Sequence, residues 1–196
     1  MDNGNQNQIK TVNVELTNSI KPKSIKNTHT AEASMAKKIP KKRVVTETSK
    51  WHFGTDELSY QKQFEYMNQI HQSNITPSNE STCKFILQQI NQKIYGYGSQ
   101  DLKKKKMNTE QFIQTDDVIK LMIECKNMCF YCKEPVQVLY ENVREPKQWS
   151  LDRLDNNFGH NKNNVVISCL ICNLRRKTMY HERYAFTKQL NIVKTN

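Results

Sequence analysis

The sequence predicts an α+β fold in which a helical section precedes a small section of two strands and a helix. After residue 51, apolar residues recur at the three- and four-residue spacing that is typical of helices. Further along, two Cys-x-x-Cys pairs flank short apolar runs of strand-like composition. We therefore divide the chain into an arm at 1–50, a helical section at 51–115 and a cysteine-containing section at 116–196.

Composition narrows the class of partner. Hydrophobic residues make up only 36% of the 196 residues, so not all of the chain can surround a core. The net charge is +11 and the isoelectric point is about 9.3. This charge favours a polyanionic partner such as DNA or RNA, although a merely soluble basic protein would have it too.

The sequence also bears on location. No apolar run is long enough to span a membrane, and the first nine residues lack the hydrophobic segment of a secretory signal. We therefore expect an intracellular protein, nuclear or cytoplasmic, with no membrane partner. In that setting six cysteines indicate metal ligands or buried thiols rather than disulfides. The abundance of Lys and Asn is a weak hint of an A+T-rich genome, viral or otherwise.

Residues 1–50 contain no aromatic side chain, and they hold ten basic against four acidic residues. Such a stretch cannot bury enough apolar surface to offset the entropy lost on ordering, so we predict a disordered basic arm and order from Trp51 onward. Within the arm, Lys41, Lys42 and Arg43 belong to a basic cluster that resembles a nuclear localisation signal. The same cluster would suit contacts with phosphates, or it is simply a solvated run of charge.

Three helices are predicted before the first cysteine pair. Residues 57–72 form an amphipathic pattern, and a second helix follows with its apolar face on Cys83, Ile86, Leu87, Ile90 and Ile94. The run Tyr95-Gly96-Tyr97-Gly98 should end that helix, which leaves the lysines at 103–106 in a loop or at a helix start. A third helix begins near Thr115, where Asp116 and Asp117 suit the positive end of the helix dipole.

The pattern changes after Cys129. Residues 136–140, 149–153 and 165–168 look extended, and the polar segment 154–164 connects the last two of these runs. A helical period returns between residues 179 and 190. Trp149 and Leu151 alternate with polar neighbours, so we interpret them as core residues rather than as base-stacking platforms.

Four cysteines have the spacing of a zinc site. Cys129 and Cys132 form one Cys-x-x-Cys pair, Cys169 and Cys172 form the other, and thirty-six residues separate the pairs. Two such pairs can complete a tetrahedron around one Zn²⁺, and this leaves no open position, so the ion would be structural rather than catalytic. A redox role suits a lone pair better than two pairs beside predicted strands. Cys83 and Cys125 fall on the apolar faces of predicted helices and are interpreted as core residues.

The segment between the cysteine pairs contains the candidate chemistry. Asp152 ends a predicted strand and Asn173 directly follows the last cysteine. One carboxylate and one amide oxygen suit Mg²⁺ or Mn²⁺, and an ion held in this way can stabilise charge on a scissile phosphate. The nearby Arg153, Arg175, Arg176 and Lys177 add positive charge for a phosphate backbone.

Cys129 to Lys177 resembles a known family. The matching elements are Cys-x-x-Cys, Leu151-Asp152 at the end of a strand, Asn164-Val165-Val166, and Cys169-x-x-Cys172-Asn173. In this order they resemble an HNH endonuclease of the four-cysteine kind, which has the treble-clef-like ββα-metal fold. Asp-Arg-Leu-Asp-Asn, Gly-His and Asn-Val-Val look like the branch common in phages and large DNA viruses.

The resemblance implies a role for each matching residue. Asp152 and Asn173 would bind the catalytic Mg²⁺ or Mn²⁺, and Asn164 would hold the loop and the general base in place. The family usually has a histidine after the metal-binding aspartate, whereas this chain has Arg153, which stays protonated and cannot be an ordinary base. Either His160 swings in as the base, or no protein base is used and Arg153 clamps the phosphate.

Three functions are therefore open on the sequence. The first is a metal-dependent HNH endonuclease that hydrolyses phosphodiester bonds in DNA. The second is a catalytically weak or inactive zinc module that binds nucleic acid, with His160 as an ordinary loop residue. The third is a protein-interaction module resembling a ubiquitin-ligase finger, which the basic charge and the Asp152/Asn173 pair disfavour.

Overall fold

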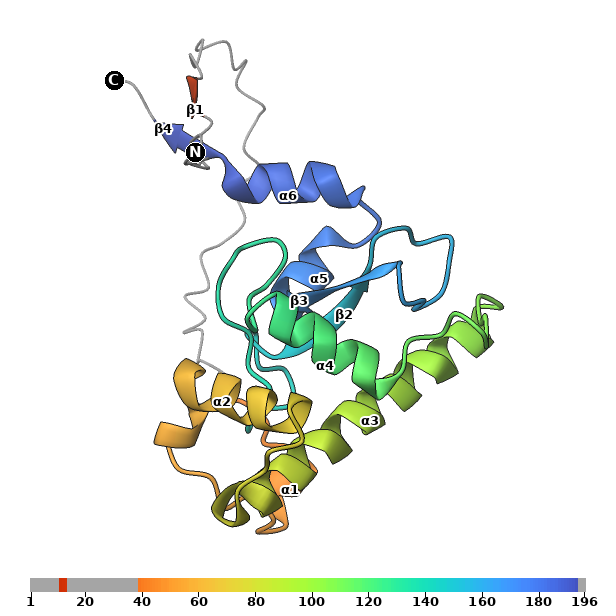
Figure 1. Cartoon of the computed structure of the whole chain (residues 1–196). Coiled ribbons are helices and arrows are strands. Elements are labelled where there is room, and N and C mark those ends of the chain that lie inside the picture. The colour runs from red at the N-terminus through yellow and green to blue at the C-terminus, as the bar shows by residue number, and fades with distance from the viewer. Residues whose placement is uncertain (1–10, 14–38, 194–196) are drawn as a thin grey trace, which may run out of the picture.

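Helices form the first half of the chain, and a two-stranded antiparallel sheet with two helices forms most of the second half (Figure 1). The computed structural model describes residues 11–13 and 39–193. The helices before the first cysteine pair are α1 (Val44–Glu47), α2 (Tyr60–His71), α3 (Glu80–Lys103) and α4 (Thr115–Glu124), with 3₁₀ turns at Asp56–Leu58 and Pro77–Asn79. The predicted α+β class is confirmed.

Order begins earlier than the predicted boundary at Trp51. The backbone N–H of Arg43 donates to the Glu141 carbonyl (2.8 Å), and the Val143 N–H donates to the Lys41 carbonyl (2.9 Å). The Arg43 guanidinium lies over the Tyr140 ring, 4.2 Å from its centroid. The aromatic partner belongs to another segment, so the composition of the arm itself could not reveal this contact. The remainder of the predicted disordered arm, at 1–10 and 14–38, lies outside the described residues.

Helix α2 falls within the predicted range of 57–72 and buries Tyr66, Met67 and Ile70. Its Gln63 is also buried, and the side-chain oxygen accepts hydrogen bonds from the backbone of Val138 (2.6 Å) and Leu139 (2.9 Å). This explains why the predicted extended run at 136–140 is not a strand. The N–H groups of Val138 and Leu139 bond to a glutamine side chain, and within the described part of this run only Gln137 forms a bridge to a neighbouring segment, at Gln148.

Helix α3 continues through the two glycines that were predicted to end it. Each glycine costs about 1 kcal/mol in a helix, which packing can offset. Gly98 is buried, and a Cβ there would lie 3.3 Å from the Phe112 ring, so the missing side chain permits a close approach. Tertiary packing thus overrides the local signal, and the lysines at 103–106 follow the end of a long helix.

The sheet pairs β2 (Trp149–Arg153) with β3 (Val165–Cys169). Helix α5 (Leu170–Arg176) starts directly after β3, and Lys177, with φ of 52°, separates it from α6 (His181–Gln189). The helical period predicted after residue 179 therefore belongs to a separate helix. At the far end, β1 (Thr11–Asn13) pairs in parallel with β4 (Asn191–Val193).

The core is shared between the helical section and the cysteine section. Buried side chains from Tyr66 on α2 to Tyr184 on α6 belong to one hydrophobic cluster. Trp149 and Leu151 are 0% and 1% exposed within this cluster, which confirms that they are core residues. The predicted boundary at 115/116 is therefore not a boundary between separate cores. Among the described residues, no helix is long and apolar enough to cross a membrane.

Candidate functional site

The four predicted cysteine ligands lie together. The sulfur atoms of Cys129, Cys132, Cys169 and Cys172 are all within 4.8 Å of one another. The Cys132 and Cys169 sulfurs are 3.9 Å apart, close to the edge of about 3.8 Å expected for a tetrahedron with Zn–S bonds of about 2.3 Å. The cluster could hold a metal ion and is compatible with structural zinc.

Local backbone bonds shape the two halves of this cluster. The Cys129 N–H donates to the Glu134 carbonyl (2.8 Å), and the Lys133 N–H donates back to the Cys129 carbonyl (3.0 Å). The Phe130 N–H donates to the Ile167 carbonyl (2.8 Å), which fastens the first pair to β3. Cys169 is the last residue of β3 and Cys172 lies in the first turn of α5, so the strand-to-helix junction presents the second pair.

The sulfurs influence one another strongly. A hydrogen bond from Cys169 lowers the pKa of Cys129 to about 5, and the same bond raises the pKa of Cys169. Burial raises the pKa of Cys172 to about 11, and the Cys129 charge adds to this rise. The negative charge of one thiolate therefore opposes the ionisation of the neighbouring thiols. A bound cation would supply the positive charge that lets all four cysteines ionise together.

A pocket of about 280 Å³ lies beside the cluster, between α3, β2 and α5. Four of the five residues predicted to be catalytic line it: Asp152, Arg153, His160 and Asn173. The other lining residues are Tyr97, Gln100, Lys104, Leu151, Asn156, Leu174 and Lys177. The fold thus gathers residues from the helical section and from the segment between the cysteine pairs around one cavity.

His160 is held rigidly in this pocket. Its Nδ1 lies 2.9 Å from Oδ1 and 3.0 Å from Oδ2 of Asp101, and its backbone N–H donates to Oδ2 (2.6 Å). The Tyr97 ring stacks on the imidazole, with centroids 4.5 Å apart. Burial lowers the pKa of His160, the Asp101 carboxylate opposes this shift, and Arg153 and Lys104 add to it. The sequence predicted a histidine that swings into place, whereas the structure has one that is already fixed.

Sequence reasoning missed Asp101. It lies on α3 and is fully buried, but the predicted end of the helix at 95–98 placed it in a loop. The available signal was periodicity, because Ile94 and Asp101 are seven residues apart and share one helix face. A buried carboxylate on an otherwise apolar face indicates a specific partner.

Asp152 is less available as a metal ligand than the sequence predicted. Arg176 binds it through Nε–Oδ2 (2.6 Å) and Nη2–Oδ1 (2.7 Å), and the Tyr131 hydroxyl donates to Oδ2 (2.8 Å). Burial and the Asp152 charge raise the pKa of Tyr131, so that hydroxyl remains a donor. The carboxylate is 4% exposed and its charge is balanced by the guanidinium.

The predicted nucleic-acid contacts divide into buried and exposed residues. Arg176 is 2% exposed and also donates to the carbonyls of Arg153 and Met179, so its assignment as a surface contact is corrected to an interior one. Its neighbour in the chain, Arg175, is exposed, as are Lys177, Lys41 and Lys42. Arg43 is half-buried against Tyr140 and lines a different pocket.

Asn173 and Asn164 have different partners. The Asn173 amide nitrogen donates to the Leu151 carbonyl (3.1 Å) and to the Ser150 hydroxyl (3.2 Å), so its oxygen faces away from these two acceptors. Asn164 bonds across the β2–β3 loop: its nitrogen donates to the carbonyls of Asp155 and Gly159 (2.9 Å each), and its oxygen accepts from the Asp155 N–H (2.9 Å).

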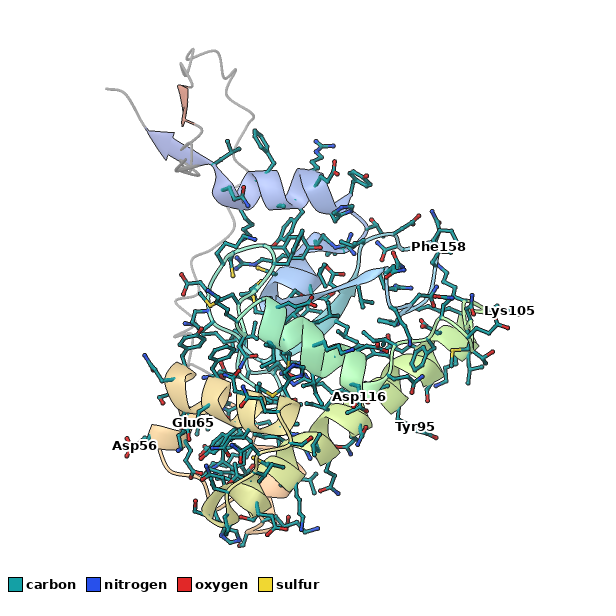
Figure 2. All side chains as sticks on the ribbon, in the orientation of Figure 1. Asp56, Glu65, Tyr95, Lys105, Asp116 and Phe158 are labelled. Carbon is teal, nitrogen blue, oxygen red and sulfur yellow. The ribbon has the colours of Figure 1, made fainter. Side chains whose placement is uncertain are left out.

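Positive side chains lie at the rim of the pocket. Arg153 donates to the Phe158 carbonyl (3.2 Å), and Lys104 and Lys177 line the same cavity. The tip of the loop at Phe158 and the end of α3 at Lys105 occupy one corner of the molecule (Figure 2), and the Lys106 ammonium donates to the Asn156 carbonyl there. The lining therefore combines an imidazole with the basic side chains of Arg153, Lys104 and Lys177.

Comparisons of the chain with protein-family models, with curated proteins and with solved structures gave no match.

Proposed function

We propose that the protein is an HNH-type endonuclease that hydrolyses phosphodiester bonds in DNA, on a ββα-metal domain in which the four cysteines hold a structural zinc ion. The observation that carries the proposal is the single pocket lined by Asp152, Arg153, His160 and Asn173. The sequence alone predicts a role in phosphodiester chemistry for these residues. Their meeting with Lys104 and Lys177 supports a site for a phosphate.

The cations bind and orient the substrate. Arg153, Lys104 and Lys177 would contact the scissile phosphate and stabilise the extra negative charge that develops as water attacks it. His160 takes the proton of that water at Nε2, because Nδ1 is engaged by Asp101. The water oxygen bonds to phosphorus, the P–O bond to the leaving oxygen breaks, and that oxygen takes a proton from solvent water. Since burial lowers the pKa of His160, the imidazole is neutral and able to accept a proton at pH 7.

The contacts of Asp152 do not support the open site for Mg²⁺ or Mn²⁺ that the sequence predicts between Asp152 and Asn173. The Asn173 oxygen is a suitable ligand, but the Asp152 carboxylate already receives two bonds from Arg176 and one from Tyr131. An added divalent ion would share a carboxylate whose charge is already balanced. The roles proposed here are accordingly those of the protein's own side chains, and divalent-ion dependence is measured directly.

Nicking of supercoiled plasmid tests the proposal. The wild-type protein is assayed with Mg²⁺, with Mn²⁺ and with EDTA, beside His160→Ala and Asn173→Ala. His71→Ala and Asn74→Ala are matched controls, because they remove the same side-chain types from exposed positions. We expect nicking by the wild type and both controls, and a rate at least roughly a hundredfold lower for His160→Ala. DNA left intact by the wild type under all three conditions would refute the enzyme assignment.

A second candidate is a zinc module that binds nucleic acid without cutting it. The Asp152–Arg176 pair favours it, because this pair occupies the carboxylate expected to be catalytic. Under this alternative, binding would weaken steeply as salt is raised, since released counterions drive phosphate contacts. A gel shift with that salt dependence, together with intact DNA in the nicking assay, decides in its favour.

A further inference from the structure

We infer that Asp101 is a positioning residue for His160, so that the helical section completes the active site from outside the cysteine-framed segment. This inference rests on the proposed function, because it assigns His160 the role of general base. Asp101 lies 59 positions before His160 and comes from a different part of the fold. It also assigns a role to α3, for which the sequence indicated none.

Three hydrogen-bond contacts join the two residues. The Asp101 carboxylate meets Nδ1 with both oxygens, at 2.9 and 3.0 Å, and it accepts the His160 backbone N–H at 2.6 Å. Both side chains are almost fully buried, with 5% and 1% of their areas exposed for His160 and Asp101. The contact therefore sets the position of the residue as well as the orientation of its ring.

The partner decides the tautomer of the ring. An ionised carboxylate can only accept hydrogen bonds, so Nδ1 must carry the proton that is donated to Asp101. In the neutral imidazole the lone pair then resides on Nε2. Within the described residues every hydrogen bond of the ring runs through Nδ1, which leaves Nε2 as the basic atom of a residue that lines the pocket.

The end of α3 is built to hold this arrangement. Tyr97 stacks on the imidazole, and its hydroxyl oxygen accepts the Leu151 N–H (3.0 Å), so one side chain contacts both β2 and His160. A Cβ at Gly159 would lie 2.5 Å from the Lys106 carbonyl and 2.7 Å from Asp101 Oδ2. Only a glycine lets the loop come this close to the helix.

The first experiment reads the tautomer in the full chain. Nitrogen-15 chemical shifts of the imidazoles are measured, and the His160 signals are assigned as those lost in His160→Gln. We expect the Nδ1–H form in the wild type. In Asp101→Asn the new amide N–H₂ would face Nδ1 and favour the Nε2–H form. A wild-type ring in the Nε2–H form overturns the inference, and this measurement needs no enzymatic activity.

The second experiment reads the pH profile of nicking for Asp101→Asn, with Asp116→Asn as the matched control at an exposed position. We expect Asp116→Asn to match the wild type and Asp101→Asn to be slower by roughly a hundredfold at neutral pH. Asp101 raises the His160 pKa, whereas Arg153, Lys104 and burial lower it, so loss of the carboxylate should move the acid limb of the profile to lower pH. An equal loss at every pH would show a purely structural role.

The two readouts separate the possible failures. If the wild-type protein has the Nδ1–H form but leaves DNA uncut, the nuclease proposal is refuted. The role of Asp101 in positioning a catalytic base is then refuted as well, although its contact with His160 is confirmed. Nicking by a wild type in the Nε2–H form refutes the positioning role alone. If Asp101→Asn does not fold, as judged by circular dichroism, the wild-type tautomer decides the inference.

Discussion

Two buried carboxylates lie in or next to the same pocket, and their partners differ: Asp152 lines the pocket, and Asp101 contacts His160, which lines it. Asp152 on β2 binds Arg176 through two hydrogen bonds, and Asp101 on α3 binds the ring and backbone of His160. Both carboxylates are nearly inaccessible, and each contributes a hydrogen-bonded pair between distant segments. The Asp152–Arg176 and Asp101–His160 pairs are therefore alike in how deeply they are buried.

The partner decides what each pair can do. A guanidinium does not release its proton in proteins, so the Asp152–Arg176 pair has one charge state and acts as a fixed link between β2 and α5. An imidazole titrates near neutrality, so His160 can take up a proton while Asp101 keeps its ring in place. We call the Asp152–Arg176 pair the arginine wall and the Asp101–His160 pair the histidine wall. Under the proposed function the chemistry occurs at the histidine wall, and the arginine wall is a structural link.

The largest effect is expected from the cluster of four cysteines. Removing zinc with a chelator should destabilise the protein by on the order of 10 kcal/mol and abolish its cooperative unfolding transition. Elemental analysis should find one zinc ion per chain. Cys132→Ser should lose the ion, whereas Cys125→Ser, which changes a half-buried cysteine outside the cluster, should retain it. A zinc-free protein with an unchanged melting curve would refute the structural role.

The next largest effect is expected from breaking the Asp152–Arg176 pair of the arginine wall. Arg176→Met leaves the Asp152 carboxylate buried without its partner, which should cost about 3–5 kcal/mol in the free energy of unfolding, measured with urea. Adding Asp152→Asn should recover much of this loss, because the uncompensated charge is removed. Arg175→Met, at the exposed neighbouring position, should change stability little. A double variant no more stable than Arg176→Met would show that the pair is not the link we describe.

The sequence predicted the parts of the site that are local. Each Cys-x-x-Cys pair and the strands at 149–153 and 165–168 depend on neighbours within a few positions. Short-range spacing determines such features, and it is visible in the chain itself. The four predicted cysteine ligands accordingly lie together in the structure.

The missed parts depend on contacts between distant segments. The role of Asp101 depends on its contact with His160. The glycines of α3 are tolerated because Phe112 packs on Gly98. The run at 136–140 bonds to Gln63. Arg176 looked like a surface cation because a sequence does not show which side of a short helix faces a buried acid. Periodicity extended through the glycines would have recovered Asp101 alone.

A smaller effect is expected from a substitution that disturbs the histidine wall and leaves the rest of the fold in place. Gly159→Ala places a methyl group against the Lys106 carbonyl and the Asp101 carboxylate, so the loop or the end of α3 must move. Overpacking of this kind costs about 1–3 kcal/mol, and the displacement should reduce nicking more than the loss of stability explains. Gly54→Ala is the control, because a Cβ there meets nothing within 4 Å. Unchanged nicking by Gly159→Ala would show that this close approach is not required.

The smallest effect distinguishes the two walls by pH. The pKa of His160 is lowered in the folded protein, mainly by burial, so the unfolded chain binds the proton more readily. The stability that the neutral ring contributes is present above the unfolded pKa of about 6.5 and is lost as pH falls through the folded value. The free energy of unfolding, measured with urea, should therefore fall below about pH 6.5 by more in the wild type than in His160→Gln. The arginine of the other wall does not titrate in this window, so a double variant that replaces Asp152 with Asn and Arg176 with Met should keep the same slope. If the dependence of the unfolding free energy on pH disappears in the double variant instead of in His160→Gln, the titrating group belongs to the arginine wall. That outcome would contradict the prediction.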